Sequence, residues 1–423
     1  MKTDVLIAGS GCAGLYLAIN LPRDKNVLII TKSKVYDCDS YLAQGGICML
    51  RDETDFESFY NDTLKAGHFE NCKESVEVMI KSSPDVLKDL LEYGTEFNRD
   101  EKGELMYTKE GAHSKNRILF HKDITGREIT EKLFKKVKTL KNVTVMEDTA
   151  LVDIISRDNI CYGGIVADKE NNISTVEASY TVFATGGVGG LFKHSTNFKH
   201  LTGDALAIAL KHNVELKDVS YVQIHPTTLY SEKAEERSFL ISESVRGEGA
   251  KLYNKNMERF ANELLPRDLL TKEILKQMDT DKSEFVWEDL RTIPKEEVAK
   301  HFPNIVAKCK ERGYDVYNEC IPVVPAQHYF MGGVKIDTFG KTSMKNLYAV
   351  GETACNGVHG RNRLASNSLL ESLVFAKRAA EDIAENKAPA KEFNTENIDL
   401  NKYNNLENLK NEYKKAVLSE INK

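Results

Sequence analysis

Several features that would mark a membrane or secreted protein are missing from this chain of 423 residues. No run of about 18 apolar residues occurs, although a membrane-spanning helix requires one. The N-terminus, MKTDVLIAGSGCAG, has an acid at Asp4 and glycines that interrupt its apolar run, so it is a poor secretion signal. These absences favour a cytoplasmic protein without a membrane partner.

Patterns typical of metal or nucleic-acid binding are also scarce. The eight cysteines form no CxxC pair and no ligand-like spacing with histidine, so we expect reduced thiols and no metal site. A net charge of −6 gives no electrostatic reason to expect nucleic acid as a partner. The length predicts two or three domains, or one large domain with an insertion.

The N-terminal segment has the pattern of a dinucleotide-binding βαβ unit. A strand is expected over residues 4–8, a helix after GSGCAG, and a second strand within NVLIITK, residues 26–32. A GxGxxG motif between strand and helix is specific, because its glycines let backbone N–H groups approach a pyrophosphate. NAD-binding folds place an acid at the end of the second strand, and Thr31 and Lys32 stand there instead, which argues against NAD.

Further glycine-rich segments favour a flavin. DSYLAQGGI (39–47), ATGG (184–187) and GET (351–353) supply more backbone donors than one pyrophosphate needs. The polar edge of a flavin ring would use them. The alternative is that these segments are ordinary turns.

The rest of the chain contains a strand-rich segment followed by a charged, helical one. Alternating strands within residues 142–187 predict a small antiparallel sheet beside the nucleotide-binding sheet. Charged helical patterns such as EEVAKHFPNIVAKCKERG indicate an insertion. We therefore expect an α/β fold with a Rossmann-like FAD-binding domain formed by residues 1–218 and 330–387. An inserted α+β capping domain spans 219–329, and a polar tail or helix spans 388–423.

These motifs resemble a known family. AQGGI, ATGG, HPT, RGEGA, PRD, PAQHY, GGV, GET and NRLASNSLLE occur in the order found in the fumarate reductase and succinate dehydrogenase flavoprotein family. The resemblance spans about residues 4–385. Respiratory members bind flavin covalently through a histidine, but this chain has Asp39 in that place, so the resemblance implies non-covalent FAD. It also implies that the family's C-terminal helical domain is largely absent.

Carried over residue by residue, the resemblance implies an FAD site. Its residues would be Gly9, Ser10, Gly11, Cys12, Ala13, Gly14, Lys32, Asp39, Ser40, Tyr41, Leu42, Ala43, Gln44, Gly45, Gly46, Asp204, Glu352, Ser368 and Leu369.

The resemblance also implies a dicarboxylate substrate. The substrate-binding residues would be His225, Ser242, Glu243, His328 and Arg363. Arg267 matches the family's proton donor and acceptor, and its alternatives are a salt bridge to Asp268 or a carboxylate anchor. A buried dianion needs several donors, among which arginine is preferred for its bidentate geometry.

The stretch YTKEGAHSKNR, residues 107–117, bears on the choice of substrate. Taken alone, so charged a loop is usually solvated surface. Aspartate differs from succinate by one ammonium group, so a site for aspartate needs an accepting or negative group. Glu110 matches the glutamate of the E-G-(G/A)-H-S loop in the aspartate-oxidising branch of the family, and we expect it to act with Arg267 in catalysis. The cations of the loop would serve the dicarboxylate pocket.

The reaction implied is FAD-dependent oxidation of L-aspartate to 2-iminosuccinate, with hydride transfer from Cα to flavin N5. Reoxidation by O2 would give H2O2, and reoxidation by fumarate would give succinate. This reaction would be the first step of de novo NAD biosynthesis, with a hand-off to quinolinate synthase. The alternative is a soluble fumarate reductase or succinate dehydrogenase flavoprotein subunit. A non-catalytic flavin-binding protein would not need the full set of histidines and arginines.

Overall fold

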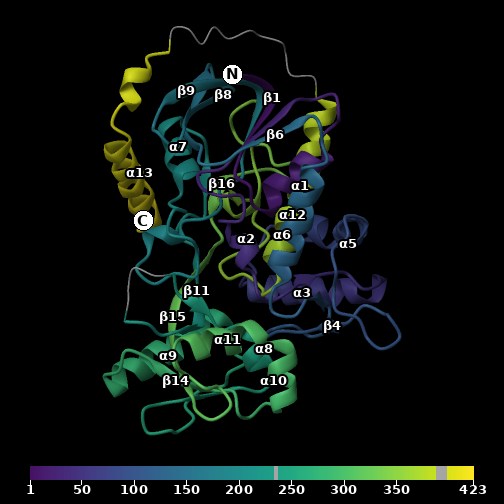
Figure 1. Cartoon of the computed structure of the whole chain (residues 1–423), viewed down its shortest axis with the longest axis vertical. Coiled ribbons are helices and arrows are strands. Elements are labelled where there is room, and N and C mark those ends of the chain that lie inside the picture. The colour runs from purple at the N-terminus through teal and green to yellow at the C-terminus, as the bar shows by residue number, and fades with distance from the viewer. Residues whose placement is uncertain (233–236, 387–397) are drawn as a thin grey trace.

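The computed structural model describes residues 1–232, 237–386 and 398–423 (Figure 1). Two lobes lie one above the other along the long axis, and the upper lobe holds both labelled chain ends. Strands β11 (Val222–Leu229) and β15 (Ile321–Phe330) pair with each other and run from the upper lobe into the lower one.

A seven-stranded sheet forms the centre of the upper lobe. In spatial order its strands are β6 (Val143–Met146), β2 (Val27–Ile30), β1 (Lys2–Ala8), β9 (Ile173–Phe183), β8 (Ile160–Ala167) and β7 (Ala150–Arg157), with β17 (Leu347–Ala349) also beside β9. The pairings β6–β2–β1–β9–β17 are parallel, whereas β7, β8 and β9 pair antiparallel. Val5 faces Val27 in parallel register, so the expected βαβ unit is confirmed.

One strand lies elsewhere than expected. Residues 143–146 extend the parallel sheet beside β2, whereas the alternating pattern had suggested the antiparallel sheet. Helix α6 (Thr125–Val137) precedes this strand, and a helical crossover returns the chain parallel to its neighbours.

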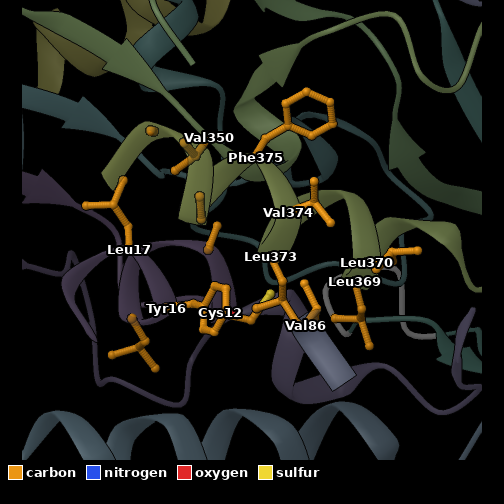
Figure 2. Close-up of a cluster of buried hydrophobic side chains, with 14 of the residues drawn as sticks. Cys12, Tyr16, Leu17, Val86, Val350, Leu369, Leu370, Leu373, Val374 and Phe375 are labelled. Carbon is orange, nitrogen blue, oxygen red and sulfur yellow. The ribbon is translucent and has the colours of Figure 1, made fainter. Parts of the chain in front are cut away.

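Helices cover both faces of this sheet. Val5 and Ile7 of β1 face a cluster that includes α1 (Cys12–Asn20) and α12 (Asn367–Glu385), whereas Leu6 and Ala8 face the opposite cluster. Figure 2 shows where α1 meets α12, with Tyr16 and Leu373 among the labelled side chains at this contact. This packing fixes the starts of both helices relative to the ends of the central strands.

On the opposite face lie α7 (Asp204–Lys211) and α13 (Leu406–Ile421). Tyr413 and Val417 of α13 are buried in the same cluster as α7. The remaining helices of the upper lobe are α2 (Asp39–Leu42), α3 (Phe56–Ala66), α4 (Lys73–Lys81) and α5 (Ser83–Glu92). Its short strands are β3 (Ile47–Cys48), β4 (Tyr107–Thr108), β5 (Ile118–Leu119), β10 (Leu216–Lys217), β16 (Gly333–Lys335) and β18 (Ala354–Cys355).

The lower lobe is a five-stranded antiparallel sheet with helices packed on it. Its other strands are β12 (Phe239–Leu240), β13 (Lys251–Tyr253) and β14 (Val286–Asp289), and its helices are α8 (Glu243–Gly247), α9 (Arg267–Asp281), α10 (Lys295–His301) and α11 (Pro303–Glu311). The pattern EEVAKHFPNIVAKCKERG forms two helices, because Pro303 disfavours helical backbone at Phe302, whose φ is −126° and ψ is 42°.

The proposed domain limits at 218/219 and 329/330 stay predictions, and the limit at 387/388 lies outside the described residues. Within the described part of the chain, no helix is both long and apolar enough to cross a membrane.

Candidate active site

One elongated cavity runs from the carboxyl end of β1 to the start of the lower lobe. It encloses about 1680 Å³ of empty space, part of it open to solvent. Its lining extends from Ala8 and Gly9 of the upper lobe to Glu243 and Arg267 of the lower one, so side chains of both lobes meet in one cavity.

The first end of the cavity is built from backbone. The φ of Gly9 is +122°, and a Cβ there would lie 1.9 Å from the carbonyl oxygen of Ala184, so only glycine fits. Helices α1 and α7 begin at this end after Gly11 and Gly203, which have no side chain to cap them; the first N–H of α1, that of Cys12, donates to Ser40 Oγ at 2.9 Å. Helix N-termini attract anions.

Lys32 adds a cation at this end. Its Nζ lies 2.5 Å from Asp204 Oδ2 and donates to the carbonyl oxygen of His200 at 2.7 Å. Both charged side chains line the cavity. The pair joins the end of the second strand to the first turn of α7.

Polar atoms without partners lie along the middle of the cavity. Asp39 Oδ2 and Gln44 Oε1 are buried and have no hydrogen-bond partner among the described residues. The other oxygen of Asp39 accepts from the Phe198 N–H at 3.0 Å. Burial raises the pKa of Asp39 to about 7. Burial also raises the pKa of Glu352, which accepts from the Phe330 N–H at 2.9 Å.

Most residues implied for FAD lie on this wall, and two do not. Gly14 instead allows close packing, since a Cβ there would lie 2.2 Å from the Gly9 carbonyl oxygen. Tyr41 turns away, and its hydroxyl donates to Glu131 Oε1 at 2.9 Å. The implied residues that line the cavity are Gly9, Ser10, Gly11, Cys12, Ala13, Lys32, Asp39, Ser40, Leu42, Ala43, Gln44, Gly45, Gly46, Asp204, Glu352, Ser368 and Leu369.

Buried charged side chains form the second end of the cavity. Arg267 begins α9, and its Nε donates to Glu243 Oε2 at 2.6 Å. Asp268 instead lies 3.1 Å from His68 Nε2, so the considered salt bridge from Arg267 to Asp268 is not formed. Burial alone would raise the pKa of Glu243, but Arg267 and Arg246 together lower it.

Gln223 links the two arginines of this end. Its Oε1 accepts from Arg267 Nη1 at 3.0 Å, and its Nε2 donates to Asn362 Oδ1 at 2.8 Å and to the Arg363 carbonyl at 2.9 Å. The Arg363 guanidinium lies 4.5 Å from the Tyr329 ring centroid. Burial, together with the charge of Arg267, lowers the pKa of Arg363 to about 10.

Two histidines, His225 and His328, lie at the same end of the cavity as Arg267 and Arg363. Their ring centroids are 5.2 Å apart, and both side chains line the cavity. His225 Nδ1 lies 3.0 Å from the Thr227 carbonyl oxygen and 3.2 Å from the Thr227 N–H, so Nδ1 has a partner in either tautomer. His225 Nε2 is buried and has no partner among the described residues. Thr196 Oγ1 lies 2.7 Å from His328 Nδ1. Burial and the charge of Arg267 lower the pKa values of His225 and His328, which favours neutral rings.

Glu110 is the acid that faces this cationic cluster, and it is buried rather than solvated. It lines the cavity and accepts from Ser366 Oγ at 2.7 Å and from Ser244 Oγ at 2.9 Å. Burial and the nearby charge of Glu243 raise its pKa. The acid therefore has hydroxyl donors but no directly paired cation within the described structure.

The cations of the same loop do not serve the pocket, contrary to expectation. Arg117 is fully buried and pairs with Asp55 and Asp62 at 3.0 and 2.6 Å. Lys115 donates to the Thr54 carbonyl at 3.2 Å. Two carboxylates next to the loop draw its arginine away from the cavity.

Residues 4–369 match the protein family described as FAD binding domain. The chain is 52% identical over 380 residues to the L-aspartate oxidase of Clostridium perfringens, a match that covers 90% of this chain and 86% of that protein. The chain belongs to the L-aspartate oxidase family. It is also 39% identical over 391 residues to the L-aspartate oxidase of Bacillus subtilis, with 90% and 72% of the two chains covered.

The fold of this L-aspartate oxidase family member is shared with fumarate reductases. The quinol fumarate reductase of E. coli superposes with a TM-score of 0.87 at 29% identity, over 93% of this chain and 72% of that one. A flavocytochrome c3 fumarate reductase gives a TM-score of 0.72 at 26% identity, over 90% and 78% of the two chains. The family expected from the motifs is confirmed.

FAD is the cofactor of this L-aspartate oxidase family member, and the cavity fits it. The glycine wall and the N-termini of α1 and α7 suit a pyrophosphate, and the unpartnered Asp39 and Gln44 oxygens suit N–H donors of a heterocycle.

Sequence reasoning missed several residues of the site. Gln223, Ser244 and Ser366 bond directly to residues singled out from the sequence, and Arg237 lines the cavity near Asp39. Ser366 lies within the motif NRLASNSLLE, and Gln223 and Ser244 lie two residues from the motifs HPT and RGEGA, but the motifs give no signal of where these side chains point.

Proposed function

We propose that this protein oxidises L-aspartate to 2-iminosuccinate with FAD. The observation that carries the proposal is the position of Glu110, an acid at the same end of the cavity as Arg267, Arg363 and the two histidines. Two carboxylates and one ammonium group are the charges that such a set complements.

The first end of the cavity would hold FAD, which when bound supplies the hydride acceptor. The N-terminus of α1 and Lys32 would bind the phosphates, and residues 39–46, Glu352 and Ser368 would lie along the ring system. Asp39 would make no covalent bond, since a carboxyl replaces the histidine of the respiratory enzymes.

Arg363, His225 and His328 would grip the substrate carboxylates. Arg363 Nε is a buried donor without a partner among the described residues, and His225 Nε2 is a buried ring nitrogen that likewise has none there. Buried donors left unpaired are costly, and a dianion relieves that cost.

Arg267 and Glu243 would handle protons and help close the site. The ion pair between them holds the guanidinium at the cavity wall, and Gln223 fixes a second edge of it. In fumarate reduction Arg267 would deliver a proton to substrate carbon, with Glu243 as its charged partner. Ser242 caps α8 by accepting from the Ser244 N–H at 3.3 Å, which sets the direction of Glu243.

Glu110 would recognise the substrate nitrogen. The oxidation removes a hydride from Cα and one proton from nitrogen, so a group that accepts that proton must lie beside the ammonium. The Glu110 carboxylate is such a group, and the ammonium cation in turn favours its charged form.

We extend the proposal to the surroundings of the reaction. Oxygen would act as the electron acceptor and yield H2O2, or fumarate would act and yield succinate. The step would open de novo NAD biosynthesis in the cytoplasm, with 2-iminosuccinate passed to quinolinate synthase.

Product analysis tests the proposal. FAD-loaded protein in air should release one H2O2 per L-aspartate, and hydrolysis of the imine should give oxaloacetate and ammonia. Without oxygen, fumarate should replace O2 and appear as succinate. Protein that reduces fumarate from a reduced dye yet forms no ammonia from aspartate would instead be a soluble fumarate reductase.

A further inference from the structure

The loop that presents Glu110 has a buried support that plays no part in the chemistry above. Glu110, His113 and Arg117 expose only 6%, 7% and 0% of their surface, although residues 109–117 have the composition of a solvated loop. Long polar side chains are rarely buried so completely unless each has partners.

Arg117 is held on three sides. Its Nε and Nη2 donate to the two oxygens of Asp55 at 3.2 and 3.0 Å, and its Nη1 donates to Asp62 Oδ2 at 2.6 Å. Its Cζ lies 5.0 Å from the centroid of the Phe59 ring. Lys115 also lies 3.8 Å from Asp55, so the two carboxylates match the charges of Arg117 and Lys115.

His113 connects Arg117 to the segment directly before α12. Arg117 Nη1 lies 3.1 Å from His113 Nδ1, and His113 Nε2 lies 3.0 Å from the Ala365 carbonyl oxygen. A guanidinium can only donate and a carbonyl can only accept. The ring is therefore the neutral tautomer with its proton on Nε2, and burial lowers its pKa to about 4.

The next residue after Ala365 binds Glu110. Ser366 has a left-handed backbone, with φ of +61°, and its hydroxyl donates to Glu110 Oε2 at 2.7 Å. The Gly46 N–H donates to the same hydroxyl at 3.2 Å. A non-glycine residue keeps such a backbone only where its surroundings impose it. The hydrogen bond from His113 to Ala365 is one such constraint.

We propose that His113 and Arg117 are positioning residues that select the amino-bearing dicarboxylate by holding Glu110 in place without a cation beside it. The inference rests on the proposed role of Glu110. A charged histidine or a free arginine here would neutralise the carboxylate and compete with the substrate ammonium. The support avoids both, because Arg117 is balanced by Asp55 and Asp62 and His113 is neutral.

Two substitutions at His113 test its two hydrogen bonds one at a time, the one with Arg117 and the one with the Ala365 carbonyl. In His113→Asn the side-chain oxygen can still accept from Arg117, but the donor to Ala365 is lost. In His113→Gln the amide can still reach Ala365, but the acceptor for Arg117 is lost. We expect His113→Asn to lower kcat/KM for aspartate about tenfold and His113→Gln about threefold, as for one lost buried hydrogen bond.

Fumarate reduction is the internal control for both variants. Fumarate lacks an ammonium, so its kcat/KM should fall less than about twofold, within the error of a remote change. His212→Gln is the matched substitution, since His212 bonds to Asp153 and Ser156 away from the cavity. FAD content and thermal melting are measured for each protein. The double variant Glu110→Gln/His113→Asn should lose no more aspartate activity than Glu110→Gln alone.

The outcomes distinguish this inference from the proposed function. Wild-type protein inactive on aspartate overturns the proposed function itself. If wild type oxidises aspartate but the His113 variants lose both reactions equally, or neither, the positioning role is wrong. Nitrogen-15 NMR of the wild-type histidines needs no variant: a neutral Nε2–H ring at pH 7 is expected for His113, and a charged ring there would overturn the inference.

Discussion

The two ends of the cavity recognise charge by opposite means. Near Gly9 and the start of α7 the wall is backbone, and anions would meet helix N-termini and one lysine. Near Glu110 and Arg267 the wall is buried charged side chains, each held by hydrogen bonds from other segments. The first end suits any dinucleotide pyrophosphate, whereas the second has a charge pattern that few small molecules match. Substitutions should therefore affect cofactor retention at one end and substrate chemistry at the other.

The largest effect is expected at Arg267. Arg267→Gln removes the ion pair to Glu243 and the group that would deliver a proton to fumarate, so the rate at which fumarate reoxidises the reduced flavin should fall about a thousandfold. FAD content should stay near that of wild type, and stopped-flow absorbance measures the rate. Arg259→Gln is the control, because Arg259 pairs with Glu263 near the surface of the lower lobe. Loss of less than tenfold would leave Arg267 no role in catalysis.

Substitution of Glu110 should impair aspartate oxidation much more than fumarate reduction. Glu110→Gln removes the charge that pairs with the ammonium, and kcat/KM for aspartate should fall about a hundredfold, as for truncation of a buried charge pair. Fumarate reduction should fall no more than a few-fold. Glu104→Gln, on an exposed part of the preceding segment, serves as the control. Equal losses on both substrates would return Glu110 to a structural role.

Substitution of Gln223 should slow aspartate oxidation and fumarate reduction to the same extent. In Gln223→Glu the carboxylate still accepts from Arg267 but cannot donate to Asn362 or to the Arg363 carbonyl, so both reactions should slow about tenfold. Steady-state kinetics with aspartate and with fumarate check this. Gln277→Glu on α9 is the matched change outside the cavity. A loss confined to aspartate would contradict the linking role.

Lys32 should matter only at the cofactor end. Lys32→Ala removes the cation beside Asp204 and should weaken FAD binding about fivefold, as for a partly exposed charge. Titration of the apoprotein with FAD measures this change. At saturating FAD, kcat for aspartate should be unaltered. Lys34→Ala, which removes a surface pair with Asp148, controls for loss of charge.

The smallest expected effect is a change in the affinity for aspartate with pH. Burial and Glu243 raise the pKa of Glu110 above its usual 4.5, and ammonium pairs with the carboxylate rather than the acid. Affinity for aspartate should therefore weaken as pH falls through this raised pKa, earlier than an ordinary glutamate would predict. KM measured across pH should show this trend in wild type and lose it in Glu110→Gln. A parallel trend in both proteins would assign it to another group.

Local patterns predicted the cofactor end well. The strand, glycine turn and helix at Gly9–Gly14 lie in one short segment, so spacing alone indicated the βαβ unit that the register of β1 and β2 confirms. The one misplaced strand, β6, followed an alternating pattern that does not distinguish parallel from antiparallel partners.

The substrate end depends on contacts between distant segments. Ser366 binds Glu110 across 256 positions, and Gln223 reaches Arg363 across 140. Such partners cannot be found from spacing. The same limit applies to Arg117. Its charge suggested that it faces solvent or the substrate pocket, but it pairs with Asp55 and Asp62, which lie far from it in the sequence.

Anaerobic titration of the FAD-loaded protein with L-aspartate and with succinate tests the central claim most directly. The two ligands share both carboxylates, so only the ammonium, and hence Glu110, distinguishes them. The account predicts that aspartate bleaches the flavin absorbance at concentrations where succinate leaves it oxidised. Bleaching by succinate with no response to aspartate would contradict it.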